Sequence, residues 1–168
     1  MTKKQNLYVG QAGQARVMSE FLIRGYNVAV PEVDIGDDLF VVDDRNGSYW
    51  KIQIKTAEIK SASAFIKIKG VQLATPPQPE LAYVFVFYKR SEDCVEWLDC
   101  LVFWRAQLSN IYAQYGLDTT SKQFRETGDY PSDVGMNFSV DSNANFFYAK
   151  QNMSAHKNNW SLWPAITW

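Results

Sequence analysis

Three residues in the first third of the chain carry side chains that could hold a divalent cation beside a phosphate. They are the acid Asp38, the amide Gln53 and, two residues later, the amine Lys55. Carboxylate and amide oxygens suit Mg²⁺, which prefers hard oxygen ligands, and the lysine ammonium is a compact positive charge for a phosphate. The simpler alternative is an ordinary cross-strand pair between Asp38 and Lys55, worth about 0.2–1 kcal/mol.

The charges around these residues form two blocks of opposite sign. Residues 32–44 hold six acids and no base, whereas residues 51–69 hold five lysines and one acid, Glu58. Two solvated faces that neutralise each other would have this pattern, and so would a cation site beside a polyanion. The directions of the side chains decide between these interpretations, so the strands that carry them have to be placed first.

An Asn-Gly pair at positions 46–47 predicts a hairpin that folds the two blocks onto each other, because Asn-Gly favours a two-residue turn. With that turn, Asp38 is opposite Lys55, and Gln53 is a diagonal neighbour on the same face. Asp37 is then expected to point to the opposite face. A longer four-residue loop is the alternative, and a slip of one residue would reverse the facings.

The hydrophobic pattern of the whole chain predicts an α/β fold with a mixed sheet flanked by helices. Apolar residues at helical spacing predict helices at residues 11–24 and 106–115. Residues 81–88 are apolar on both faces, which is typical of a central strand. The other predicted strands are residues 26–33, 39–42, 50–56, 64–69, 99–104 and 145–149.

The order of these motifs resembles the core of the PD-(D/E)xK nuclease superfamily, which includes Holliday junction resolvases and many restriction endonucleases. The matching residues are Glu20 on the first helix, the acidic turn Asp34-Ile-Gly-Asp-Asp38 before one strand, and Gln53-Ile-Lys55 on the next. The resemblance covers residues 11–57, about a third of the chain. It implies a restriction endonuclease-like core.

The resemblance also implies a role for each matching residue. Asp38 would be the principal carboxylate ligand of a metal ion, with Gln53 and the backbone carbonyl of Ile54 as further ligands. Lys55 would be the motif lysine, which stabilises charge at the reacting phosphate. Glu20 would be the helix acid that orients water or binds a second metal ion.

Other residues near the motif extend this expected site. Asp34 would lie at its rim and reach the metal through water. Gln53 departs from the family pattern, which has Glu or Asp at this position, so the site has one fewer negative ligand. Lys60, Lys67 and Lys69 follow the motif and could contact nucleic acid, with a solvated strand face as the equal alternative.

Together, these features predict a metal-dependent endonuclease that hydrolyses DNA phosphodiester bonds with Mg²⁺, or with Mn²⁺ as a substitute. The alternative is a catalytically weak or inactive member of the fold that binds nucleic acid or a protein partner, because of the missing charge at Gln53. An interaction or immunity protein is a third class. Cleavage of both DNA strands would favour a homodimer.

The composition excludes several other classes of protein. The chain has 168 residues, a net charge of −1, two cysteines and a single histidine. One histidine excludes a multi-histidine zinc centre within the chain, and two cysteines are too few for a disulfide framework, which indicates a cytoplasmic protein. No apolar run approaches the roughly 18 residues of a membrane span, so no membrane partner is expected.

The length predicts a single nuclease-like domain over residues 1–168, with the motif core at 11–57 and an aromatic-rich C-terminal extension at 137–168. Three tryptophans lie in that extension. They are expected to pack over the domain or at a dimer interface, and base stacking is the alternative. They are Trp160, Trp163 and Trp168.

Overall fold

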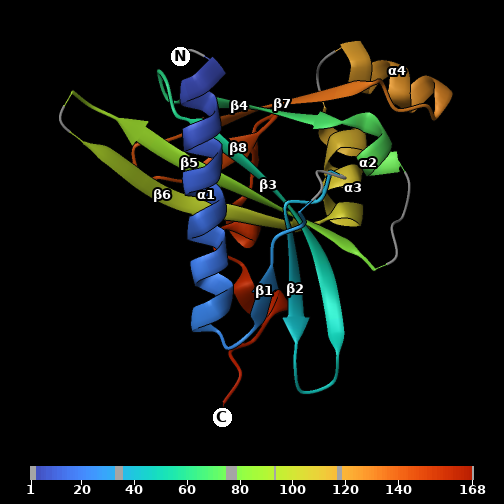
Figure 1. Ribbon diagram of the computed structural model, residues 1–168. Coiled ribbons are helices and arrows are strands. Elements are labelled where there is room, and N and C mark those ends of the chain that lie inside the picture. Colours follow the sequence, from blue (N-terminus) through green and yellow to red (C-terminus); the bar gives the residue numbers. More distant parts are fainter. Residues whose placement is uncertain (1–2, 33–35, 75–78, 93, 117–118, 168) are drawn as a thin grey trace.

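The computed structural model describes residues 3–32, 36–74, 79–92, 94–116 and 119–167 (Figure 1). Its helices are α1 (Lys3–Ile23), α2 (Gly70–Ala74), α3 (Arg105–Tyr115) and α4 (Thr119–Thr127), with 3-10 helices η1 (Ser154–His156) and η2 (Trp160–Leu162). Its strands are β1 (Asn27–Ala29), β2 (Leu39–Asp43), β3 (Ser48–Glu58), β4 (Ser63–Lys69), β5 (Leu81–Arg90), β6 (Val95–Trp104), β7 (Asp133–Val140), β8 (Phe146–Tyr148) and β9 (Gln151–Asn152). Among the helices described, none has both the length and the hydropathy needed to cross a membrane.

Five strands form the main sheet in the order β1-β2-β3-β5-β6. The strands β3 and β5 run parallel, and the other neighbours are antiparallel, so the sheet is mixed. In β5, residues 81–88 are all buried, which is the pattern of a strand covered on both faces. The predicted α/β fold with a mixed central sheet is therefore confirmed.

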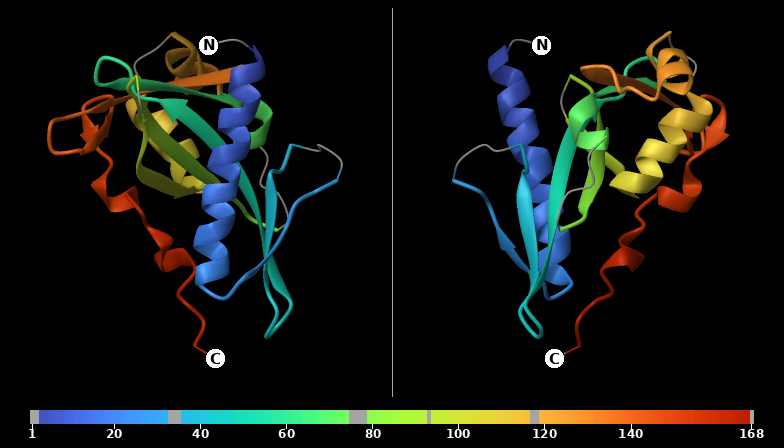
Figure 2. Two further views of the ribbon diagram at one scale, coloured as in Figure 1. Left: turned by 60° about the vertical axis from the view of Figure 1, so that its left-hand side comes forward. Right: turned by 90° about the vertical axis from the view of Figure 1, so that its right-hand side faces the viewer.

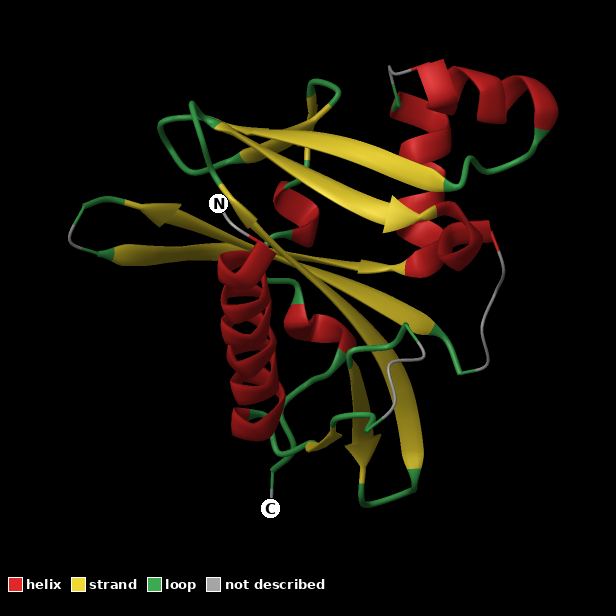
Figure 3. Ribbon diagram, turned by 45° about the horizontal axis from the view of Figure 1, so that its top comes forward, coloured by secondary structure: helices red, strands yellow, loops and turns green. Residues whose placement is uncertain are grey.

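A second sheet, which the hydrophobic pattern did not predict, packs against the first (Figure 3). It has the order β4-β7-β8-β9, and all its pairs are antiparallel. Its first strand follows β3 directly through a tight turn, in which Ser61 and Ala62 have φ angles of 46° and 62°. Positive φ at both central residues is typical of the type I′ turn. The chain therefore passes from one sheet into the other within a few residues.

Helices and the second sheet cover the two faces of the main sheet (Figure 2), and each face has a hydrophobic core. On one face, α1 packs through Val17 and Phe21, and the C-terminal segment adds Trp160 and Trp163. The ring of Phe21 lies 5.6 Å and 5.1 Å from the rings of these two tryptophans. On the other face lie α3 and the second sheet. Trp160 and Trp163 are 7% and 0% exposed, so packing within the fold is confirmed for them, and Trp168 lies outside the described residues.

The close approach of α1 to β3 depends on Gly13. A Cβ atom at this position would lie 2.0 Å from Oγ1 of Thr56. Any larger residue would therefore push the helix away from the strand, unless Thr56 moved. The contact places the next helix residue, Gln14, beside the start of β2, where its Nε2 donates to the carbonyl of Asp38 at 2.8 Å.

The register of the β2–β3 hairpin differs from the predicted one. Leu39 is opposite Ile52, and Asp38, the residue before β2, contacts Gln53 through its side chain, so the predicted pairing of Asp38 with Lys55 is wrong. The register is shifted by two residues along one strand. Because side chains alternate with a period of two, the residues of β2 and β3 keep their predicted faces. The correction therefore moves Asp38 next to Gln53 without taking it away from the expected patch.

Asp43 explains why the loop is longer than the Asn-Gly pair suggested. Its carboxylate accepts hydrogen bonds from the backbone N–H and the Nε of Arg45, at 3.0 Å and 2.9 Å. Its carbonyl accepts from the N–H groups of Asn46 and Gly47. These contacts close a four-residue loop over residues 44–47. The guanidinium of Arg45 also holds the pKa of Asp43 below its ordinary value.

Candidate functional site

Asp38 lies where the chain enters β2, and β3 and α1 hold it in place. Its Oδ2 accepts hydrogen bonds from Nε2 of Gln53 and from the N–H of Ile54, the latter at 2.6 Å. Its backbone N–H donates to the carbonyl of Ile52 at 3.0 Å, while its carbonyl accepts from Gln14 of α1. Contacts with β3 and α1 thus position Asp38 just before β2.

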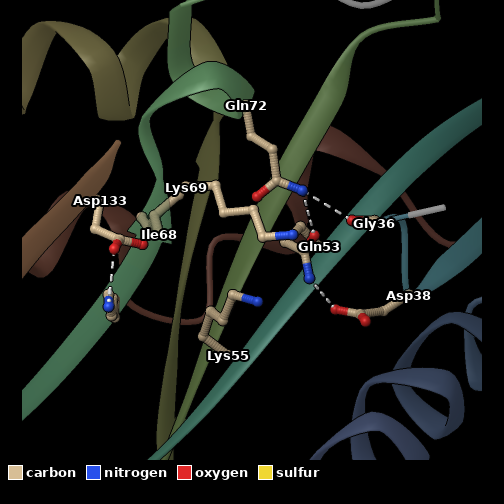
Figure 4. A pocket seen from close by; sticks show the side chains of 9 residues that line it. Gly36, Asp38, Gln53, Lys55, Ile68, Lys69, Gln72 and Asp133 are labelled. Carbon is tan, nitrogen blue, oxygen red and sulfur yellow. Dashed lines mark hydrogen bonds and ion pairs between the residues drawn. The ribbon is translucent and has the colours of Figure 1, made fainter. Parts of the chain in front are cut away.

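The amide of Gln53 continues this hydrogen-bond network away from Asp38. Gln53 is 2% exposed, and its Oε1 accepts from Nε2 of Gln72 at 3.1 Å. The same Nε2 of Gln72 donates to the carbonyl of Gly36 at 3.0 Å. Figure 4 shows the resulting line of contacts from Gly36 through Gln72 and Gln53 to Asp38.

Lys55 projects from β3 on the same face as Gln53. Both residues line an open cavity of about 390 Å³, together with Asp38, Lys69 and Gln72. Figure 4 shows the side chains of Lys55 and Lys69 directed into this space. Within the described part of the chain, neither lysine side chain has a hydrogen bond or an ion pair. Two positive charges therefore remain available to a ligand beside the Asp38 carboxylate.

A second open cavity, of about 270 Å³, shares Asp38 and Lys55 with the first. Its other wall is α1, which contributes the amide side chains of Asn6, Gln11 and Gln14. The acid and the lysine therefore lie between a lysine-lined cavity and an amide-lined one. An extended polar ligand could pass over the two residues and occupy both sides.

Glu20, the predicted helix acid, lies elsewhere on α1. It forms an ion pair with Arg24, one turn further on, at 3.6 Å, and it lines neither cavity. The α1 residue that contacts Asp38 is Gln14, and Glu20 lies six positions further along, which corresponds to about 9 Å along a helix. The structure therefore does not bring Glu20 to the cluster. Asp34, predicted at the rim, lies outside the described residues.

The hairpin pattern predicted that Asp37 points to the face opposite Asp38, and this prediction is wrong. Its carboxylate pairs with Nζ of Lys51 at 3.0 Å, and Lys51 lies on the same face of β3 as Gln53. The alternation rule does not extend to Asp37 because β2 begins only at Leu39. The residue before it in this turn, Gly36, has a φ of +95°, which is far from strand geometry.

The three lysines predicted to contact nucleic acid differ in their partners. Lys67 lines the larger cavity, but it pairs with Asp133 at 2.9 Å. Lys60 lies outside that cavity and pairs with Glu58 at 3.6 Å. Lys69 lines the cavity without a partner among the described residues. Of the three, Lys69 is therefore the best placed to bind an anion next to Lys55.

Gln14, Gly36 and Gln72 belong to the site and were not among the candidates from the sequence. Gln14 lies on the predicted helix, but a neutral amide carries no sequence signal for a contact with Asp38. Gln72 comes from α2, a helix of five residues, which reaches the site through tertiary packing alone. Gly36 belongs to the acidic sequence at residues 34–38, and its positive φ is a conformation that glycine adopts readily.

Tyr83 of β5 lies beside Gln53 across the parallel β3–β5 pairing. It is fully buried, and burial raises the pKa of its phenol well above the ordinary value, an effect that nearby Arg105 only partly offsets. The phenol is therefore neutral at physiological pH. It supplies no charge to the neighbouring cluster, whose charged groups are Asp38 and the lysines.

The donor atoms around Asp38 fit a hard cation. In the residues that the structure describes, no group of three or more His, Cys, Asp or Glu side chains converges. The donors beside the cluster are the Asp38 carboxylate and the carbonyl of Ile54. The amide oxygen of Gln53 accepts from Gln72 and would join them only if the amide turned over, because Nε2 of Gln53 faces Asp38. The carbonyl of Ile54 faces the same strand edge as the Ile54 N–H, which binds Asp38. One carboxylate with neutral oxygens suits Mg²⁺, which keeps several waters and accepts phosphate oxygens.

Comparison with known proteins supports the fold. No family model matches the sequence, and no curated protein matches it either. Among solved structures, the chain is similar to a bacterial homing endonuclease, I-Ssp6803I, with a TM-score of 0.51 and 14% sequence identity. The match covers 96% of this chain and 93% of that chain. At this identity the similarity concerns the fold, and it confirms the predicted restriction endonuclease-like fold class.

Proposed function

We propose that this chain is a metal-dependent nuclease that hydrolyses DNA phosphodiester bonds at the cluster of Asp38, Gln53 and Lys55. One observation carries the proposal. An acid held by α1 and β3 lies beside a lysine whose side chain has no partner among the described residues, and both line an open cavity. The fold around them is similar to that of a homing endonuclease, which adds support for a nuclease.

The residues of the cluster would have distinct tasks. Asp38, the amide oxygen of Gln53 and the carbonyl of Ile54 would hold Mg²⁺ or Mn²⁺. The bound cation would polarise the phosphate and lower the pKa of a water molecule. The ammonium group of Lys55 would stabilise the negative charge that develops on the phosphate during hydrolysis.

The two cavities favour a polymer over a small phosphate ester. Lys69 lies on one side of the Asp38–Lys55 pair and would bind a neighbouring phosphate. On the other side, Asn6 and Gln11 of α1 offer amide groups that can bind phosphate or sugar oxygens. Since a single cluster cuts one strand at a time, cleavage of a duplex would use two copies of the chain.

The second candidate function is binding of nucleic acid, or of a protein partner, without cleavage. Two observations favour it. No group of three or more His, Cys, Asp or Glu side chains converges among the described residues, and Gln53 presents its Nε2, and not its oxygen, to Asp38. In this case Lys55 and Lys69 would still attract a polyanion, while the cation affinity would be too low to support hydrolysis.

Cleavage assays distinguish the two functions. Supercoiled, single-stranded and branched DNA would be incubated with the protein in Mg²⁺, in Mn²⁺ and in EDTA. Under the first proposal, nicked or linear products form only with a metal, and Asp38→Asn and Lys55→Ala each lower the rate by about 100-fold or more. Lys60→Ala is the control, because this lysine lies outside the larger cavity and pairs with Glu58.

Two results would contradict the cleavage proposal. If the Asp38 and Lys55 variants cut as fast as the parent, hydrolysis does not take place at this cluster. If the parent binds DNA in EDTA but cuts none of the substrates in either metal, the binding function is favoured.

A further inference from the structure

Gln72 of α2 joins the two chain segments that carry the candidate site. Its Nε2 donates to the carbonyl of Gly36, two residues before Asp38, and to Oε1 of Gln53 on β3. A primary amide carries two N–H hydrogens, so one nitrogen can serve both acceptors. The side chain of Gln72 therefore bridges the turn that leads to Asp38 and the strand that holds Gln53 (Figure 4).

The direction of this hydrogen-bond chain is fixed by the groups at its two ends. The carbonyl of Gly36 can only accept, so Gln72 has to turn its nitrogen toward it. The ionised carboxylate of Asp38 can only accept as well, so Gln53 has to turn its nitrogen toward Asp38. Both amides consequently point the same way, and the oxygen of Gln53 faces Gln72.

We propose that Gln72 is a positioning residue that holds the oxygen of Gln53 away from Asp38 and so lowers the cation affinity of the site. For Gln53 to offer its oxygen beside Asp38, its amide has to turn over. Its nitrogen would then face the nitrogen of Gln72, and two donors would oppose each other. Gln72 cannot turn in response without directing its own oxygen at the carbonyl of Gly36. This inference rests on the proposed function, since it concerns the cation that the nuclease would use.

The fold anchors α2 independently of the Gln72 side chain. A Cβ at Gly70 would lie 1.7 Å from the carbonyl oxygen of Pro131, so the start of the helix is in direct contact with that backbone. Leu73 is fully buried, and its carbonyl accepts a hydrogen bond from Arg105 at 2.7 Å. A substitution of Gln72 by an unbranched apolar residue of similar length should therefore leave α2 in place.

The test is a double-mutant cycle on Mn²⁺ affinity, measured by electron paramagnetic resonance of the free ion. Gln72→Met is made in the native background and in a Gln53→Glu background. A carboxylate has two oxygens and no N–H, so it has no amide orientation for Gln72 to set. The expected result is about fivefold tighter binding in the native background, equivalent to one net hydrogen bond, and no gain in the Gln53→Glu background. Gln123→Met on α4 is the control and should change nothing.

The possible results separate the inference from the proposed function. An equal change in both backgrounds, no change, or weaker binding in the native background overturns the role of Gln72. If neither the parent nor the Gln53→Glu variant binds Mn²⁺, the cation site itself is wrong, and the inference fails with it.

A measurement on the unaltered chain covers the case in which the variants fail to fold. The side-chain amide resonances of Gln53 and Gln72 would be followed by ¹⁵N NMR during a Mg²⁺ titration. The inference expects both pairs of resonances to shift together, because turning one amide breaks its contact with the other. A shift of the Gln53 resonances without a shift of those of Gln72 overturns it, and no shift in either contradicts the cation site.

Discussion

The carboxylate of Asp38 and the amide of Gln53 are neighbours at the start of the β2–β3 hairpin and are joined by a hydrogen bond from Nε2 to Oδ2. In this arrangement the amide stabilises the negative charge of Asp38 without neutralising it. A second carboxylate at the same position would instead repel the first, and the repulsion would be relieved by a cation between them.

We therefore expect Gln53→Glu to make the stability of the protein depend on metal. In EDTA, two opposed carboxylates should lower the free energy of unfolding by roughly 1–4 kcal/mol, the Coulomb energy of such a pair at partial solvent exposure. Saturating Mn²⁺ should restore most of this loss, while it changes the parent less. Thermal unfolding in EDTA and in Mn²⁺ measures both effects. Equal stability of variant and parent in EDTA would show that the two side chains are not in contact.

Lys69 and Lys60 form a matched pair for testing which surface binds DNA. Lys69 is unpaired among the described residues and faces the cavity, whereas Lys60 pairs with Glu58 outside it. In EDTA, Lys69→Ala should weaken binding to a DNA duplex and reduce the slope of log K against log salt by about 1, as expected for one lost phosphate contact. Lys60→Ala should leave the slope close to that of the parent. Fluorescence anisotropy at several salt concentrations checks this, and identical slopes for the two variants would contradict the assigned surface.

That the side chains of Asp38, Gln53 and Lys55 share one patch could be predicted, because strand alternation is local and tolerates a shift of two residues. The register of the hairpin could not be predicted, because side-chain hydrogen bonds decide between an Asn-Gly turn and a loop closed by Asp43. The same limit applies to Gln72, which reaches the site only through the packing of α2.

Parts of the fold with a hydrophobic period were expected, but one was overlooked. The buried strand at residues 81–88 was expected, and the helix predicted at residues 106–115 begins one residue earlier, at Arg105. In contrast, β7 was not predicted, although its apolar residues alternate with small and polar ones at a period of two, as in a half-buried strand. Without β7 the second sheet could not be inferred, and neither could the cavity wall that carries Lys69.

The pKa of Asp43 provides a test of the hairpin loop. Its hydrogen bonds with Arg45 lower this pKa, so the folded state favours the ionised carboxyl. The resulting contribution to stability is present above the ordinary pKa of an aspartate and is lost as the pH falls through the lowered value, below about pH 4. Asp43→Asn should therefore be less stable than the parent at pH 7, and the difference should shrink toward pH 3.

Thermal unfolding across this pH range measures the difference, with Asp44→Asn as the control. Asp44 is the adjacent acid, it is exposed, and it has no ion pair among the described residues. A constant difference between Asp43→Asn and the parent at every pH would mean that the ionised carboxyl of Asp43 does not close the loop.

Two glycines on α1 allow the helix–strand contact to be tested with a control on the same helix. A Cβ at Gly13 would lie 2.0 Å from Oγ1 and 3.0 Å from Cβ of Thr56, whereas a Cβ at Gly10 would have nothing within 4 Å. Gly10→Ala should stabilise the protein by up to about 1 kcal/mol through helix propensity. Gly13→Ala gains the same propensity but overpacks the contact, at a cost of about 1–3 kcal/mol, so it should be destabilising or at best neutral.

The same contact places Gln14 against the carbonyl of Asp38, so displacement of α1 should also disturb the candidate site. We expect Gly13→Ala to lower any metal-dependent DNA cleavage. Gly10→Ala is a control for stability only, because Gly10 lines the second cavity. Urea unfolding gives the stabilities, and adding Thr56→Gly to Gly13→Ala should recover part of the loss, since it removes the atoms that clash. If the two alanine substitutions had equal effects on stability, Gly13 would not determine how closely α1 approaches β3.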